Sequence, residues 1–179
     1  MKIATSIVGT TVLVLVVAAA ARPVAQSTGL QAELLKDLAS NRETMLKIAD
    51  AMPEEKFSFK ATPAERTYGE QILHVAGGNV ALFKMIGSKA PAPTIDQKAT
   101  AKADVLKALG DSYDFGIAAL KQQSDQSLLQ SVDGPRFLGR SSRARLVNFA
   151  IAHAQDIYGQ MVVYLRLNGI VPPASRSSV

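Results

Sequence analysis

The spacing of apolar residues constrains the fold most strongly, because it repeats every three or four positions over four long segments. These segments run over Leu30–Met52, from about Thr67 to Gly87, from about Thr100 to Gln123 and from about Ser142 to Asn168. Such a period places the apolar side chains on one face of an α-helix. No segment shows the sustained period-two alternation of a strand. The sequence therefore predicts an all-α fold, a four-helix bundle with long crossing loops.

Local signals set the ends of these helices. Thr67 and Glu70 have the spacing of a capping box, in which each side chain accepts a hydrogen bond from the other residue's backbone amide. Gly169 is the type of residue that ends a helix, and Pro172 and Pro173 follow it. Between the third and fourth helices, residues 124–140 predict an irregular connection with one short helical turn.

The first 25 residues predict an export signal. Lys2 precedes a charge-free apolar run over residues 3–21, and small residues lead to a cleavage site near Ala25. The alternative is an uncleaved N-terminal membrane anchor. In either case the predicted domain, residues 26–179, is secreted or periplasmic, and cleavage predicts a mature chain that starts close to Gln26.

Composition excludes several classes of function. The chain has no cysteine, so it has neither a disulfide framework nor a thiolate site. Lys2 and Arg22 account for two of the 20 basic residues, and no acidic residue precedes residue 26, which leaves a charge of +3 on the predicted domain. This charge is too small and too scattered for a nucleic-acid partner. The arginines of residues 136–145 predict a solvated loop and helix start.

The two histidines are the strongest candidates for a functional site. His153 lies on the last predicted helix, which is apolar over most of its circumference, so its imidazole requires a partner, a metal or a wet cavity. His74 lies within the second predicted helix, shortly before Gly77 and Gly78. Glycines inside a helix are unfavourable, and they indicate either a cavity beside His74 or the close approach of a neighbouring helix.

Two imidazoles are too few for a structural or catalytic zinc site, which needs at least three protein ligands. Glu70, one turn before His74, and Asp156, three residues after His153, are the auxiliary candidates by spacing. Each has another explanation, since Glu70 completes the capping box and Asp156 is also consistent with a solvent-facing carboxylate. No Ser/His/Asp set or phosphate-binding glycine loop is evident, so no catalytic residue is assigned.

Two blocks of sequence resemble the DinB-like (DinB/YfiT) family over about residues 30–175. They are "YGEQILHVAGGN" and "HAQDIYGQMVVYLRLNGIVPPAS". The resemblance implies a four-helix bundle, often dimeric, and in many members a divalent metal held by three histidines, one on helix two and an HxxxH pair on helix four. His74 matches the helix-two ligand and His153 the first of the pair. The third position is Ile157, so the implied site is degenerate.

The resemblance implies a function related to the metal-dependent transferases of low-molecular-weight thiols. The expected cofactor is zinc or nickel, bound weakly or not at all. The alternative is a non-catalytic bundle that binds a small molecule or a partner between helices two and four. A homodimer is expected through Tyr158, Val162 and Leu165, because the last helix carries more apolar surface than one bundle interior needs.

Overall fold

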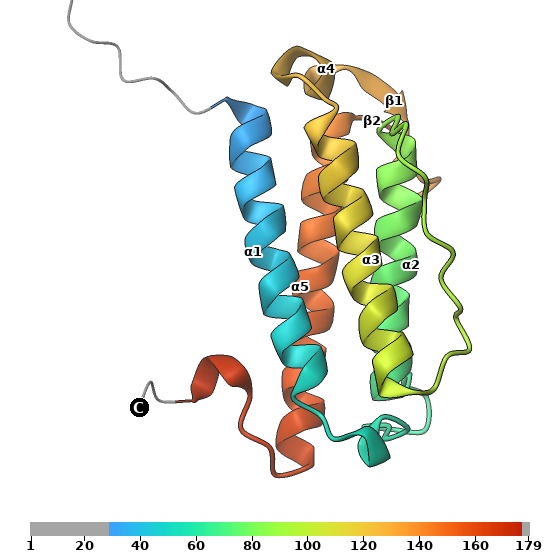
Figure 1. Ribbon diagram of the computed structural model, residues 1–179, viewed down its shortest axis with the longest axis vertical. Helices are drawn as coiled ribbons and strands as arrows, with labels where there is room; N and C mark the ends of the chain where they lie inside the picture. The colour runs from blue at the N-terminus through green and yellow to red at the C-terminus, as the bar shows by residue number, and fades with distance from the viewer. Residues whose placement is uncertain (1–28, 177–179) are drawn as a thin grey trace, which may run out of the picture.

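The computed structural model describes residues 29–176, and within them four long helices form a bundle (Figure 1). They are α1 (Leu30–Asp50), α2 (Tyr68–Met85), α3 (Lys102–Lys121) and α5 (Arg143–Leu167). α2 packs against α3 and α5, and α1 packs against the same two helices. The predicted all-α four-helix bundle is thereby confirmed. The predicted signal peptide or anchor, residues 1–25, lies outside the described residues.

The connections determine the order of the helices in space. α2 and α3 run in the same direction, so the segment between them passes along the outside of the bundle from one end to the other (Figure 1). The second long connection, from α3 to α5, stays at one end of the bundle and contains α4 (Asp125–Leu129). Short 3-10 turns lie at Glu54–Lys56 and Pro173–Ser175. α2 and α5 are consequently antiparallel neighbours.

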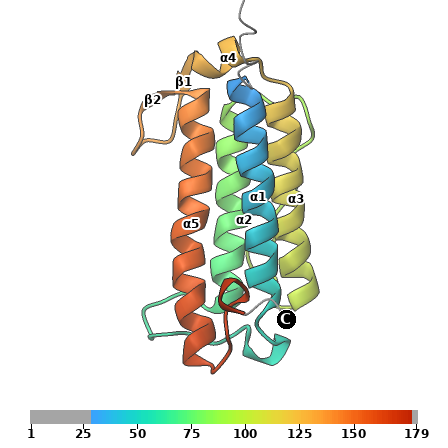
Figure 2. The same cartoon turned by 90° about the vertical axis from the view of Figure 1, so that its left-hand side faces the viewer.

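A small β-hairpin in the second connection was not anticipated by the sequence. β1 (Ser131–Asp133) pairs antiparallel with β2 (Arg140–Ser142), with Val132 opposite Ser141. Strands of three residues are too short to show an alternating pattern. The hairpin stands at the end of the bundle where α5 begins (Figure 2).

The helix-end signals are confirmed. The Glu70 amide donates to Thr67 Oγ1 at 3.1 Å, and the Thr67 amide donates to Glu70 Oε2 at 2.7 Å, which forms the predicted capping box. Gly169 has a positive φ of 70° directly after the end of α5. This conformation favours glycine and explains why the helix stops there.

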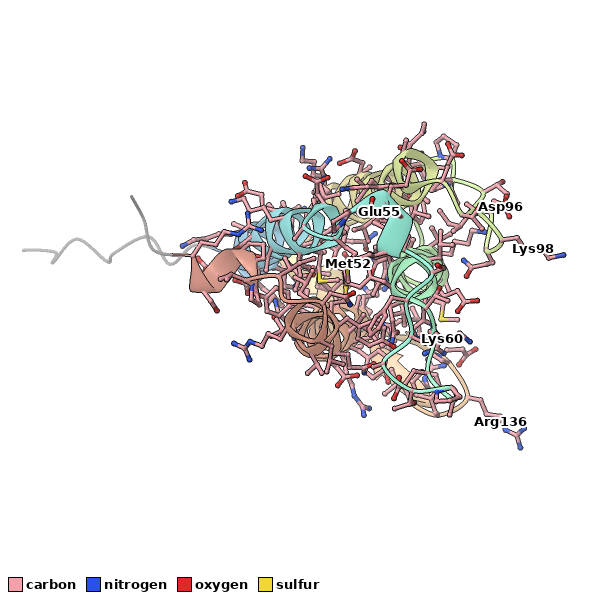
Figure 3. All side chains as sticks on the ribbon, turned by 90° about the horizontal axis from the view of Figure 1, so that it is seen from below. Met52, Glu55, Lys60, Asp96, Lys98 and Arg136 are labelled. Atoms are coloured by element: carbon pink, nitrogen blue, oxygen red, sulfur yellow. The ribbon has the colours of Figure 1, made fainter. Side chains whose placement is uncertain are left out.

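The interior of the bundle is built from the predicted apolar faces. Viewed along the bundle, Met52 lies among the helices, whereas the side chains of Lys98 and Arg136 point outward (Figure 3). Arg143 departs from the prediction of a solvated cluster, because its guanidinium donates to the Ile86 carbonyl at 3.0 Å and to the Ser127 carbonyl at 3.1 Å. This arginine ties the end of α2 and α4 to the start of α5.

The exposed face of α5 requires a correction to the predicted dimer surface. Leu165 is fully buried within the bundle and cannot contact a partner, while Tyr158 and Val162 are half-buried. The large apolar side chains that α5 does expose are Val163 and Leu167. A homodimer stays a prediction. Within residues 29–176, no helix has both the length and the apolar character needed to cross a bilayer.

Candidate metal centre

The two histidines meet between α2 and α5. His74 Nε2 and His153 Nε2 are 3.0 Å apart, although the residues are 79 positions apart in the chain. Two imidazole nitrogens bound to one tetrahedral zinc would be separated by about 3.3 Å. The observed separation also matches a hydrogen bond in which one imidazole is protonated on Nε2 and the other accepts. The pair therefore converges closely enough to share one proton or one cation.

The glycines after His74 make room for this arrangement. A Cβ atom on Gly78 would lie 3.4 Å from His153 Cε1, so the absence of a side chain lets the imidazole pack directly against α2. A Cβ atom on Gly77 would lie 2.8 Å from Gln97 Nε2, and this amide donates to the Leu73 carbonyl at 3.2 Å. Gly78 thus leaves room for the His153 imidazole, whereas Gly77 leaves room for Gln97 of the loop that crosses outside α2.

Aromatic rings cover one side of the pair. The Phe149 ring is nearly parallel to the His153 ring, with 6.3 Å between the centroids and 11° between the planes. Phe137, from the hairpin loop, lies against Phe149 at 5.4 Å between centroids. The His74 and His153 rings themselves meet edge to face at 4.8 Å. This side of the site is therefore apolar.

A polar pocket opens on the other side of His74. It has a volume of about 330 Å³ and is lined by Lys60, Ala64, Glu65, Arg66, Glu70, His74 and Gln97. The Tyr164 hydroxyl of α5 donates to the Arg66 carbonyl at 2.6 Å and fixes the backbone there. His74 thus separates a charged pocket from an apolar surface.

The structure does not bring the auxiliary carboxylates into the pair. Glu70 Oε2 accepts the capping hydrogen bond from Thr67, and Asp156 Oδ2 accepts from Gln160 Nε2 at 3.1 Å. Ile157 is 3% exposed, lies one turn after His153 and offers no donor atom. Within residues 29–176 no group of three or more His, Cys, Asp or Glu side chains is placed to hold a metal. Of the predicted site residues, the structure therefore brings together only His74 and His153.

Both imidazoles favour the neutral form that binds metals. Burial lowers the pKa of His74, and the charge of Arg66 and the neighbouring His153 lower it further. Burial also lowers the pKa of His153; the carboxylate of Asp156 opposes this effect and Arg66 reinforces it. Since the ordinary pKa of histidine is about 6.5, both rings are neutral at pH 7.

These shifts predict that metal-free protein loses stability in acid. A histidine whose pKa is lower in the folded chain stabilises the fold fully above its unfolded pKa, and this contribution falls as pH drops through the folded value. Unfolding by urea in the presence of a chelator should therefore show the free energy of unfolding decreasing below about pH 6.5. The double substitution His74→Gln, His153→Gln should flatten that part of the profile. An identical slope in both proteins would contradict the prediction.

Several residues at the site were not found from the sequence. Phe149 lies four positions before His153 on the same helical face, so its position was available from helical spacing alone. Phe137 and Arg66 come from loops, whose path the periodicity of helices does not determine. The sequence indicates that Gly78 borders a cavity or a neighbouring helix, but its contact with His153 depends on how α2 and α5 pack.

Comparison with known proteins identifies the family. The DinB family matches residues 25–177, so this chain belongs to the DinB family. No curated protein matches the chain. The fold is similar to that of a DinB-like protein from Bacillus cereus ATCC 10987, with 19% identity and a TM-score of 0.70, covering 78% of this chain and 93% of that chain. It is also similar to the DinB-like protein YjoA from Bacillus subtilis, with 16% identity and a TM-score of 0.60, covering 76% and 92%.

Proposed function

We propose that this chain is an exported DinB-family protein in which His74 and His153 bind a divalent cation, zinc or nickel, with low affinity. The observation that carries the proposal is the 3.0 Å separation of the two Nε2 atoms, which come from different helices. Burial also keeps both rings neutral, as metal ligands must be. The site has only two imidazole donors because Ile157 occupies the third position implied by the family resemblance.

The surrounding residues define what such a site can do. Lys60 and Arg66 line the pocket beside His74 together with Glu65 and Glu70, so the lining is polar and carries charges of both signs. The Phe149 ring lies nearly parallel to the His153 ring, with 6.3 Å between their centroids. A bound divalent cation would supply Lewis-acid activation of a thiol or of water. By this reasoning the chain is related to the thiol transferases of its family.

A non-catalytic role is the second candidate. An apolar pocket beside the histidine pair favours a bundle that binds a small molecule. The retained histidines favour the metal site, and the isoleucine at position 157 favours simple binding. A measurable affinity for zinc or nickel supports the metal site, and the absence of such affinity supports the non-catalytic binding role.

Calorimetric titration of chelator-treated protein with zinc and with nickel tests the metal site. We expect one weak site, because structural zinc sites with a full ligand set reach about 10–16 kcal/mol and this pair supplies only two donors. His74→Ala should abolish the binding heat, and Lys36→Ala at an exposed position of α1 serves as the control. Tight stoichiometric binding by the unmodified protein would refute the degenerate site, and an unchanged titration of His74→Ala would refute the ligand assignment.

Export is proposed from the first 25 residues, and the family match begins at residue 25, so residues 1–24 lie outside it. We expect the exported protein to start close to Gln26 and to be absent from the membrane fraction. Intact-mass measurement of the exported protein decides this. A mass that retains residues 1–21, found in the membrane fraction, would support the anchor instead.

A further inference from the structure

A second pocket lies next to the histidine pair, between α2, α5 and the loop of the β-hairpin. It has a volume of about 240 Å³ and is lined by His74, Gly78, Ala81, Leu82, Met85, Pro135, Phe137, Phe149 and His153. No charged side chain lines it, and the two imidazoles are its only polar side chains. Lys60 and Arg66 line the separate polar pocket that also borders His74. The histidine pair therefore forms one wall of a nearly apolar pocket.

The walls of this pocket match a flat, apolar guest. Phe149 and His153 present nearly parallel rings, and Phe137 lies beside Phe149. Phe137 is 72% exposed, so a large aromatic surface faces solvent at the mouth of the pocket. A guest that contacts this ring would remove apolar surface from water. A dry engineered cavity of about 150 Å³ binds benzene, so the larger volume here accommodates one or two fused rings.

The same walls exclude ionic guests. Transfer of a charged group into an apolar site is strongly unfavourable without a partner charge, and the pocket supplies none. Each neutral imidazole offers at most one donor or acceptor besides the contact within the pair. The chemistry of the site therefore selects a neutral molecule with few polar atoms.

We propose that this pocket binds small neutral aromatic compounds of one or two rings, held between Phe149, Phe137 and the histidine pair. This binding goes beyond the proposed metal site and does not require a cation. It places the ring next to His74 and His153.

Indole is a suitable probe because the chain contains no tryptophan, so indole emission is observed without a protein indole background. Titration of indole against chelator-treated protein should show saturable binding at one site. Tryptophan, which has the same ring but carries both charges of an amino acid, should bind at least tenfold more weakly.

Ala81→Phe is the variant that tests the location. Ala81 is exposed on α2 at the mouth of the pocket, so a phenyl group there fills space without disturbing the core. Indole affinity should fall at least tenfold, while Ala103→Phe, the same change at an exposed position of α3 outside the pocket, should leave it within twofold. No saturable indole binding, or equal binding by Ala81→Phe, would overturn the proposal.

Zinc titration of Ala81→Phe separates this proposal from the metal site. If Ala81→Phe retains its zinc affinity but no longer binds indole, then zinc and indole bind independently beside the same two histidines. Indole binding that survives His74→Ala while zinc binding is lost would support the pocket without the metal site. Zinc binding that His74→Ala abolishes, in a protein that binds no indole, would support the metal site alone.

Discussion

Ile157→His should raise zinc affinity by about 3 kcal/mol, which is on the order of 100-fold. The substitution places a third imidazole one helical turn after His153, on the same face of α5. Three protein nitrogens with an open fourth position form the ligand set of many catalytic zinc sites. Calorimetric titration of both proteins, after removal of metal by a chelator, measures the gain.

The matched control is Ile151→His. Ile151 is half-buried on the same helix but lies on a different face, so its imidazole should add no affinity. Because Ile157 is buried, unfolding measurements should accompany the titration to show that Ile157→His still folds. Equal zinc affinity in the wild type, Ile157→His and Ile151→His would mean that position 157 does not face the pair.

The meeting of the histidines was predictable only in part. The resemblance to DinB-like proteins placed His74 and His153 at ligand positions, and helical spacing placed Ile157 beside His153. The distance between the imidazoles depends on the packing of α2 against α5, and Gly78 permits that close contact. A residue's own sequence context does not encode the partner across a helix interface. The glycines after His74 therefore indicated a cavity between these helices, but not that Phe137 and Phe149 line it.

The fold was predictable where a signal repeats over many residues. α1, α2, α3 and α5 each bury a long periodic face, and the ends of α2 and α5 carry a capping box and a helix-ending glycine. The β-hairpin, in contrast, has only three pairs of facing residues, which is too few to give a repeating pattern in the sequence. Arg143 likewise forms long-range hydrogen bonds that charge clustering alone does not indicate. Short strands and single long-range hydrogen bonds therefore cannot be predicted from sequence patterns.

Phe83→Ala should lower the free energy of unfolding by about 3–5 kcal/mol, the usual cost of removing a buried phenyl group and leaving a cavity. Phe83 is fully buried on α2, and Gly116 of α3 faces its ring. A Cβ atom on Gly116 would lie 2.5 Å from Phe83 Cε2, so the ring occupies the space that this glycine leaves open. Urea unfolding monitored by circular dichroism measures the loss.

A double-mutant cycle shows whether this contact is the cause. Gly116→Ala alone should destabilise the protein by about 1–3 kcal/mol, since its methyl group overlaps the buried ring. In the Phe83→Ala background the ring is absent, so the same methyl group enters the cavity and the better helix propensity of alanine adds a favourable effect. The double variant should therefore be more stable than the sum of the single effects predicts, by an interaction energy of about 1–3 kcal/mol. Strict additivity would show that α2 and α3 do not approach through Phe83 and Gly116.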